Sequence, residues 1–119
     1  MDQKRQYERY PCDFEIGIIT RDGHVYTSKS YDISEQGLLV SLSQAALTNL
    51  EKTGVTFEQG EELRVSLSNN EKTMEFVILT KIAHTHYSNE GELTALGLHF
   101  EDKRLTLKHF ISGLLKQFQ

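Results

Sequence analysis

The stretch FEIGIITRDGHVY, residues 14–26, decides the fold. Its first half alternates apolar and other residues, so Phe14, Ile16 and Ile18 would share one face of an extended chain. This period of two is typical of a half-buried β-strand. The Asp-Gly pair inside RDGH favours the positive φ angles of a type I′ turn. We therefore expect a β-hairpin whose second strand covers residues 25–33.

The same alternation recurs further along the chain. It predicts four more strands, around residues 38–42, 63–67, 74–82 and 96–100. Asn69-Asn70 and Asn89-Glu90-Gly91 have the composition of turns between them. Connections this short leave little room for parallel crossovers, so we expect the strands to be antiparallel.

Two segments have helical patterns instead. Residues 44–53 predict a short helix after the third strand, with Ser43 as its cap and Gly54 closing it. Near the C-terminus, apolar residues fall on one helical stripe, namely Leu107, Phe110, Ile111, Leu114 and Phe118. Asp102 or Thr106 is suited to cap this second helix. Together the elements predict a mainly β fold, a six-stranded antiparallel barrel sealed by a C-terminal amphipathic helix.

Composition limits the classes of protein. The 119 residues fit one domain, with 38% apolar and 25% charged residues. Cys12 is the single cysteine, so no intrachain disulfide can form, which suits a cytoplasmic location. No apolar stretch has the length of a membrane span, and we expect no membrane insertion. The net charge of −4 and the pI of about 5.7 argue against DNA or RNA as a partner.

Pro11 divides the chain. The residue before a proline is pushed toward an extended conformation, so a helix cannot readily cross this point. Residues 1–11 are therefore expected to be a flexible arm, and residues 12–119 the folded domain. The arm carries Lys4, Arg5 and Arg9, a local group of cations in an acidic chain.

A second unusual stretch is YDISEQGLLV, residues 31–40. Asp32, Ser34 and Gly37 lie where one expected strand ends and the next begins. These three residue types are common in turns for local backbone reasons. Likewise, two arginines in an arm are most often solvated, so neither stretch is specific when taken alone.

Together, the two stretches resemble the motifs of the PilZ domain family. RxxxR is present as Arg5-Gln6-Tyr7-Glu8-Arg9, ahead of the first strand, and [D/N]xSxxG as Asp32-Ile33-Ser34-Glu35-Gln36-Gly37, after the second. The chain resembles this family from end to end, with every motif position filled. The resemblance implies a PilZ-like β-barrel that binds cyclic di-GMP, a bacterial second messenger, through Arg5, Arg9, Asp32, Ser34 and Gly37.

The chemistry of these residues suits that ligand. A guanidinium group such as that of Arg5 or Arg9 meets guanine O6 and N7 bidentately, and pairs equally well with phosphate. The Asp32 carboxylate can accept from the guanine N1 and N2 protons. Ser34 can donate to a phosphate oxygen or accept from N2. Gly37 either lets backbone pass close by or supplies a positive φ angle.

Lys4 is a further candidate for ligand binding. In the family, a basic residue just before RxxxR is linked to binding a stacked dimer of the ligand, and the resemblance implies that role here. The alternative is a solvated lysine.

Other candidate functional residues are supported by weaker sequence signals. His84 and His86 lie two apart on one expected strand, as two metal ligands would, but no third ligand is near in sequence. Cys12 has no evident basic partner and is expected to be an inert packed thiol. No Ser-His-Asp set, phosphate loop or catalytic carboxylate pair is evident, so we expect no enzyme, no metal and no cofactor.

The sequence thus predicts a receptor that binds cyclic di-GMP, changes conformation and regulates an unidentified protein partner in trans. The alternative is a protein-interaction module of the same fold that binds no nucleotide. A binder of single-stranded nucleic acid would need a basic groove lined with aromatic residues, and here only the arm is basic.

Overall fold

The protein is mainly β, with six strands and two helices in the part that the structure describes. This computed structural model describes residues 10–68, 75–102 and 104–116. In chain order the elements are β1 (Tyr10–Ile19), β2 (Val25–Ile33), β3 (Gly37–Ser41), α1 (Gln44–Lys52), β4 (Glu62–Ser68), β5 (Glu75–Tyr87), β6 (Leu93–Phe100) and α2 (Leu105–Leu115).

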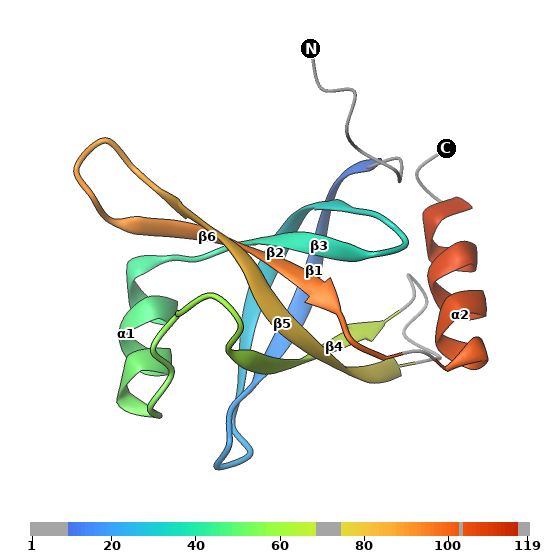
Figure 1. Ribbon diagram of the computed structural model, residues 1–119, viewed down its shortest axis with the longest axis horizontal. Coiled ribbons are helices and arrows are strands. Elements are labelled where there is room, and N and C mark those ends of the chain that lie inside the picture. Colours follow the sequence, from blue (N-terminus) through green and yellow to red (C-terminus); the bar gives the residue numbers. More distant parts are fainter. Residues whose placement is uncertain (1–9, 69–74, 103, 117–119) are drawn as a thin grey trace.

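The strands form a sheet that closes on itself in the order β1-β2-β3-β6-β5-β4 (Figure 1). Every neighbouring pair is antiparallel. The ring is closed by a short ladder in which Gly17 to Ile19 of β1 pair with Ser66 to Arg64 of β4. The predicted antiparallel β-architecture with a C-terminal helix is confirmed.

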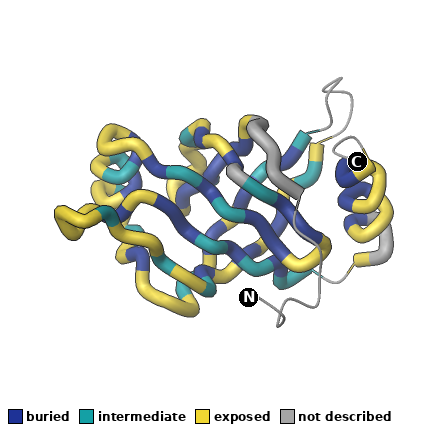
Figure 2. The backbone as a smooth tube through the Cα atoms, turned by 90° about the horizontal axis from the view of Figure 1, so that it is seen from above, coloured by how far each residue is buried: buried dark blue, intermediate teal, exposed yellow. Residues whose placement is uncertain are grey.

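The hydrophobic core fills the inside of this ring. Alternate residues of each strand point inward, which Figure 2 shows as dark blue positions between exposed ones. The fully buried side chains come from all six strands and from α1, and include Ile18, Ile33, Leu38, Val40, Leu50, Val65, Leu67, Ile78, Ile82 and Leu96. Burying these aliphatic side chains is the main force that holds the ring together.

The short helix α1 begins and ends as predicted. The Ser43 hydroxyl accepts a hydrogen bond from the backbone N–H of Ala46 at 3.1 Å, which satisfies one of the free donors at the helix start. Gly54, with φ of +96°, follows the last turn. Leu50 points from α1 into the core and is completely buried.

The second helix, α2, docks through the predicted apolar stripe but begins differently. Leu107, Phe110, Ile111 and Leu114 are buried, and the Phe110 ring lies 4.6 Å from that of Phe76 on β5. Phe118 lies outside the described residues. In Figure 1 this helix and α1 lie on opposite sides of the sheet.

The predicted cap of α2 is wrong. The N-cap residue is Arg104, with no side-chain cap, and Thr106 lies inside the helix. Asp102 lies two residues before the N-cap position. Its carboxylate accepts from the Arg104 backbone N–H at 2.9 Å and forms an ion pair with the Arg104 guanidinium at 2.7 Å. These contacts with Arg104 lower the pKa of Asp102 below its ordinary value.

The first hairpin turn lies where predicted but is not of type I′. The Gly23 N–H donates to the Thr20 carbonyl at 3.1 Å, and Gly23 has a φ of +89°. Asp22 has no positive φ angle, since Phe57 is the one non-glycine residue with such an angle in the described ranges. A longer loop with its single glycine in the left-handed region removes the strain that a type I′ turn would place on Asp22. The Asn69-Asn70 turn lies outside the described residues.

Candidate functional site

The candidate site lies where the start of β1 meets the end of β2. Tyr10 pairs with Ile33 and Pro11 with Asp32, so the last two residues of the expected arm belong to a strand. On its other side, Asp32 pairs with Leu39 of β3. Lys4, Arg5 and Arg9 lie outside the described residues, and the flexible arm stays a prediction.

Both ladders around Asp32 are irregular. The β1–β2 register shifts between Pro11 and Phe14, and the β2–β3 register shifts between Ser30 and Asp32. The buried Ser30 hydroxyl lies within hydrogen-bond distance of the carbonyls of Asp32, at 2.9 Å, and Leu39, at 3.1 Å. Such bulges redirect side chains and often lie beside binding sites. The half-buried Asp32 lies directly beside both irregularities.

Ser34 holds the turn between β2 and β3. Its backbone N–H donates to the Gly37 carbonyl at 2.9 Å, and its hydroxyl accepts from the Gln36 N–H at 3.2 Å. The residue is only 4% exposed. These are the turn contacts typical of serine. The role of Ser34 toward a ligand stays a prediction.

Gly37 is required by packing between strands. A Cβ at this position would collide with the backbone carbonyl of Leu98 on β6. Its φ angle is not positive, so of the two roles expected for this glycine, close passage of backbone is the one observed. The close neighbour is the protein's own strand.

Asp32 heads a row of residues on the outer surface of the sheet. The ladders place Leu39 beside it, then Gly97 of β6, then His84 of β5. Directly paired residues share a face, and the His84 side chain lies over the half-buried Gly97, where a Cβ would come within 3.3 Å of the His84 Cβ atom and 3.5 Å of its Cδ2 atom. The row therefore runs from Asp32 to the His84 imidazole, which covers Gly97.

Sequence reasoning missed Leu39, Gly97 and His84 as neighbours of Asp32. They come from three strands, and pairings between strands distant in sequence leave no local pattern. One signal was available: Gly97 interrupts the alternating segment LTALGLHF, and a glycine inside a strand often marks close approach of another group.

A groove lies between the same turn and α2. Its volume is about 490 Å³, within the range of small-molecule sites. Glu35 and Gln36 of the motif line it, and the Phe100 N–H holds the turn in place by donating to the Gln36 carbonyl at 2.7 Å. The opposite wall includes Lys108 of α2. Asp32, Ser34 and Gly37 are not among the lining residues.

The two histidines on β5 do not assemble a metal site. His84 and His86 both lie exposed on β5. Within the described ranges, no three histidine, cysteine or acidic side chains come together in a way that could hold an ion. Neither described helix is long and apolar enough to cross a membrane.

The family is shown by comparison with known proteins. The model of the PilZ domain matches residues 3–117, nearly the whole chain and both motifs. The chain belongs to the PilZ domain family, whose members are effector modules that bind cyclic di-GMP rather than enzymes. A search of curated protein sequences finds no match to this chain.

Solved structures share the fold. The Bacillus subtilis inhibitor of motility MotI/DgrA is 20% identical, with a TM-score of 0.70 over 98% of this chain and 51% of that protein. The MrkH–cyclic di-GMP complex of K. pneumonia is 16% identical, with a TM-score of 0.70 over 98% and 53%. The PilZ domain of Escherichia coli YcgR with cyclic di-GMP is 16% identical, with a TM-score of 0.63 over 97% and 94%. The chain thus spans about half the length of MotI and MrkH.

Proposed function

We propose that this chain is a receptor for cyclic di-GMP that clamps the ligand between its N-terminal segment and the end of β2. The observation that carries the proposal is the pairing of Tyr10 and Pro11 with Ile33 and Asp32. Arg9 immediately precedes Tyr10 in the sequence, so the RxxxR motif leads into the strand that pairs with the end of β2.

The chemistry of the two motifs is complementary. Arg5 and Arg9 supply forked donors for guanine edges and phosphates, and Asp32 supplies an acceptor for guanine N1 and N2 protons. The groove beside Glu35 and Gln36 provides further volume next to the turn. Lys4 is proposed to add charge when two stacked ligand molecules bind.

In this proposal the ligand orders the arm and so changes the surface that the protein presents. A partner protein that prefers one of the two surfaces is then regulated in trans. We place it in the cytoplasm, and we assign it no DNA or RNA partner because the chain is acidic.

Isothermal titration with cyclic di-GMP tests the proposal, with GTP and cyclic di-AMP as controls. We expect saturable binding of cyclic di-GMP alone. Asp32→Ala should weaken binding and reduce the discrimination between the two cyclic dinucleotides, because Asp32 reads the guanine edge. Equal binding of cyclic di-AMP by the unmodified protein would remove this role. A protein that binds none of the three ligands would be the nucleotide-independent interaction module instead.

A further inference from the structure

Large apolar side chains are exposed mainly on one face of the sheet, remote from Asp32. Among the described residues four such side chains are exposed: Val25 (58%), Val77 (47%), Leu79 (37%) and Tyr87 (60%). The first three gather on the outside of the β2–β1–β4–β5 segment, together with the half-buried Ile19. We call this set, with Arg64 at its centre, the aliphatic face.

The strand register fixes the arrangement of the aliphatic face. Val25 pairs with Ile19, Ile19 with Arg64, and Arg64 with Leu79, which gives one continuous row across four strands. In the next row Val77 is paired with Ser66, and Ser66 with Gly17. A Cβ on Gly17 would lie 2.8 Å from the Val25 Cγ1 atom, so the valine leans over this glycine. The aliphatic face therefore extends over four neighbouring strands.

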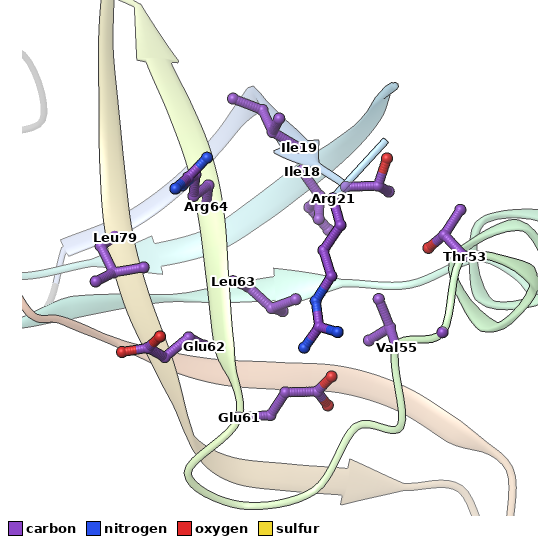
Figure 3. Close-up of a pocket in the computed structure, with 12 residues that line it drawn as sticks. Ile18, Ile19, Arg21, Thr53, Val55, Glu61, Glu62, Leu63, Arg64 and Leu79 are labelled. Carbon is purple, nitrogen blue, oxygen red and sulfur yellow. The ribbon is translucent and has the colours of Figure 1, made fainter. Parts of the chain in front are cut away.

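Within the part of the chain that the structure describes, Arg64 forms no ion pair, and its neighbours on the adjacent strands are apolar. Ion pairs among the described residues include those of His24 with Asp22, of Lys81 and His99 with Glu101, and of Arg104 with Asp102. Arg64 takes part in none of them. Apolar side chains flank it on both neighbouring strands, and in Figure 3 its guanidinium points away from Glu61.

The nearby carboxylate of Glu61 is committed elsewhere. A hollow of about 320 Å³ borders the aliphatic face and is lined by Arg21, Arg64 and Glu61, among others. Glu61 accepts from the Thr56 N–H at 3.1 Å and from its hydroxyl at 3.0 Å. Figure 3 shows Arg21 reaching across the hollow toward Glu61. Glu62, two residues before Arg64 on the same outer face of β4, also lines the hollow, but no ion pair joins these two described residues. The Arg64 guanidinium is thus available to a carboxylate of a partner.

We infer that the aliphatic face docks a segment of a partner protein in which a carboxylate is flanked by aliphatic side chains. Arginine surrounded by apolar side chains is typical of energetically important interface positions. A second copy of this chain fits less well. A two-fold contact through the centre of the face would bring Arg64 toward the same arginine of the other copy, and like charges oppose association.

A phage-displayed library of random peptides, selected on the ligand-free full chain, tests this inference independently of nucleotide binding. We expect the enriched peptides to contain Asp or Glu between aliphatic residues. Chemical-shift changes on binding a synthetic version should include the amides of Arg64, Val77 and Leu79. The face is small compared with a standard interface, so the affinity should be in the micromolar range.

Matched variants decide whether the contact is the proposed one. Leu79→Asp should weaken peptide binding by at least about tenfold, whereas Tyr87→Asp, at an exposed apolar position of β5 outside the aliphatic face, should not change it. Arg64→Glu should also weaken binding, and a peptide with Lys in place of its acidic residue should then bind this variant better than it binds the original protein. That rescue separates charge pairing from a general loss of structure.

Three results would overturn the inference. The library could yield no binders, or binders without acidic residues. The enriched peptides could bind Leu79→Asp and Arg64→Glu as tightly as the original protein. Sedimentation could reveal a dimer that Leu79→Asp dissociates, which would assign the face to a second copy of the chain.

Discussion

Gly37 is the motif residue whose structural role is the clearest. The backbone carbonyl of Leu98 occupies the space that a side chain at this position would need. Gly37→Ala should therefore destabilise the ligand-free protein by about 1–3 kcal/mol or more, because a strand backbone cannot move aside cheaply. Urea unfolding measures this change.

Gly113→Ala is the matched control for this substitution. A Cβ there meets nothing within 4 Å, and the residue lies inside α2. Alanine is the better helix former, so this variant should gain about 0.5–1 kcal/mol. Equal stability of Gly37→Ala and the original protein would show that β3 and β6 separate easily at this point.

Asp22 gives the first hairpin a pH dependence. Hydrogen bonds from Thr20 and His24 lower the pKa of Asp22 from 3.8 to about 2. Because the folded state holds the proton less tightly than the unfolded chain, the stabilisation is present above about pH 4 and is lost as the pH falls toward 2. Asp22→Asn should be less stable than the original protein at pH 5, and the two should converge near pH 2 in urea unfolding. Parallel curves over this range would contradict the assignment.

At the scale of elements, the arginines of the N-terminal segment are expected to contribute to cyclic di-GMP binding and little to the stability of the fold. Arg5→Ala and Arg9→Ala should each weaken cyclic di-GMP binding by about 5- to 150-fold, since a bidentate contact to guanine contributes roughly 1–3 kcal/mol. Arg64→Ala removes a guanidinium from β4, beside the opposite end of β1, and should leave the titration unchanged. A large fall in the melting temperature of the ligand-free Arg5 or Arg9 variant would indicate a structural role instead.

The same segment is expected to become ordered when the ligand binds. Residues 2–9 contain no aliphatic side chain, so little apolar burial can hold them in place without ligand. Amide hydrogen exchange should therefore slow across residues 2–9 on addition of cyclic di-GMP, while the amides of Ile16 to Ile18 keep their protection. Equal protection of residues 2–9 with and without ligand would mean that the segment is preformed.

Local patterns predicted the elements better than their connections. Alternation located the strands, and Ser43 and Gly54 located α1, because both signals depend on residues close in sequence. The turn type at Asp22 and the cap of α2 were wrong, since each depends on one hydrogen-bond choice among several of similar energy. The row from Asp32 to His84 was not predictable, because four strands supply it and the register shifts on the way.

At the scale of the whole molecule, ligand binding should stabilise the fold. A ligand that binds only the folded state stabilises it by about 2.7 kcal/mol at a hundredfold excess over its dissociation constant. We expect the melting temperature to rise by several degrees with cyclic di-GMP at that concentration. Asp32→Ala should show a much smaller rise at the same ligand concentration. A comparable rise with cyclic di-AMP would contradict guanine recognition.

The order of strands in the ring has a consequence for biosynthesis. β3 lies between β2 and β6, so one edge of β3 has no partner until β6, four elements later, has left the ribosome. Non-local pairings of this kind fold slowly, and unpaired strand edges invite aggregation. The nascent chain therefore exposes an open β-edge from the emergence of β3 until that of β6, and chaperone demand should be highest just before β6 emerges.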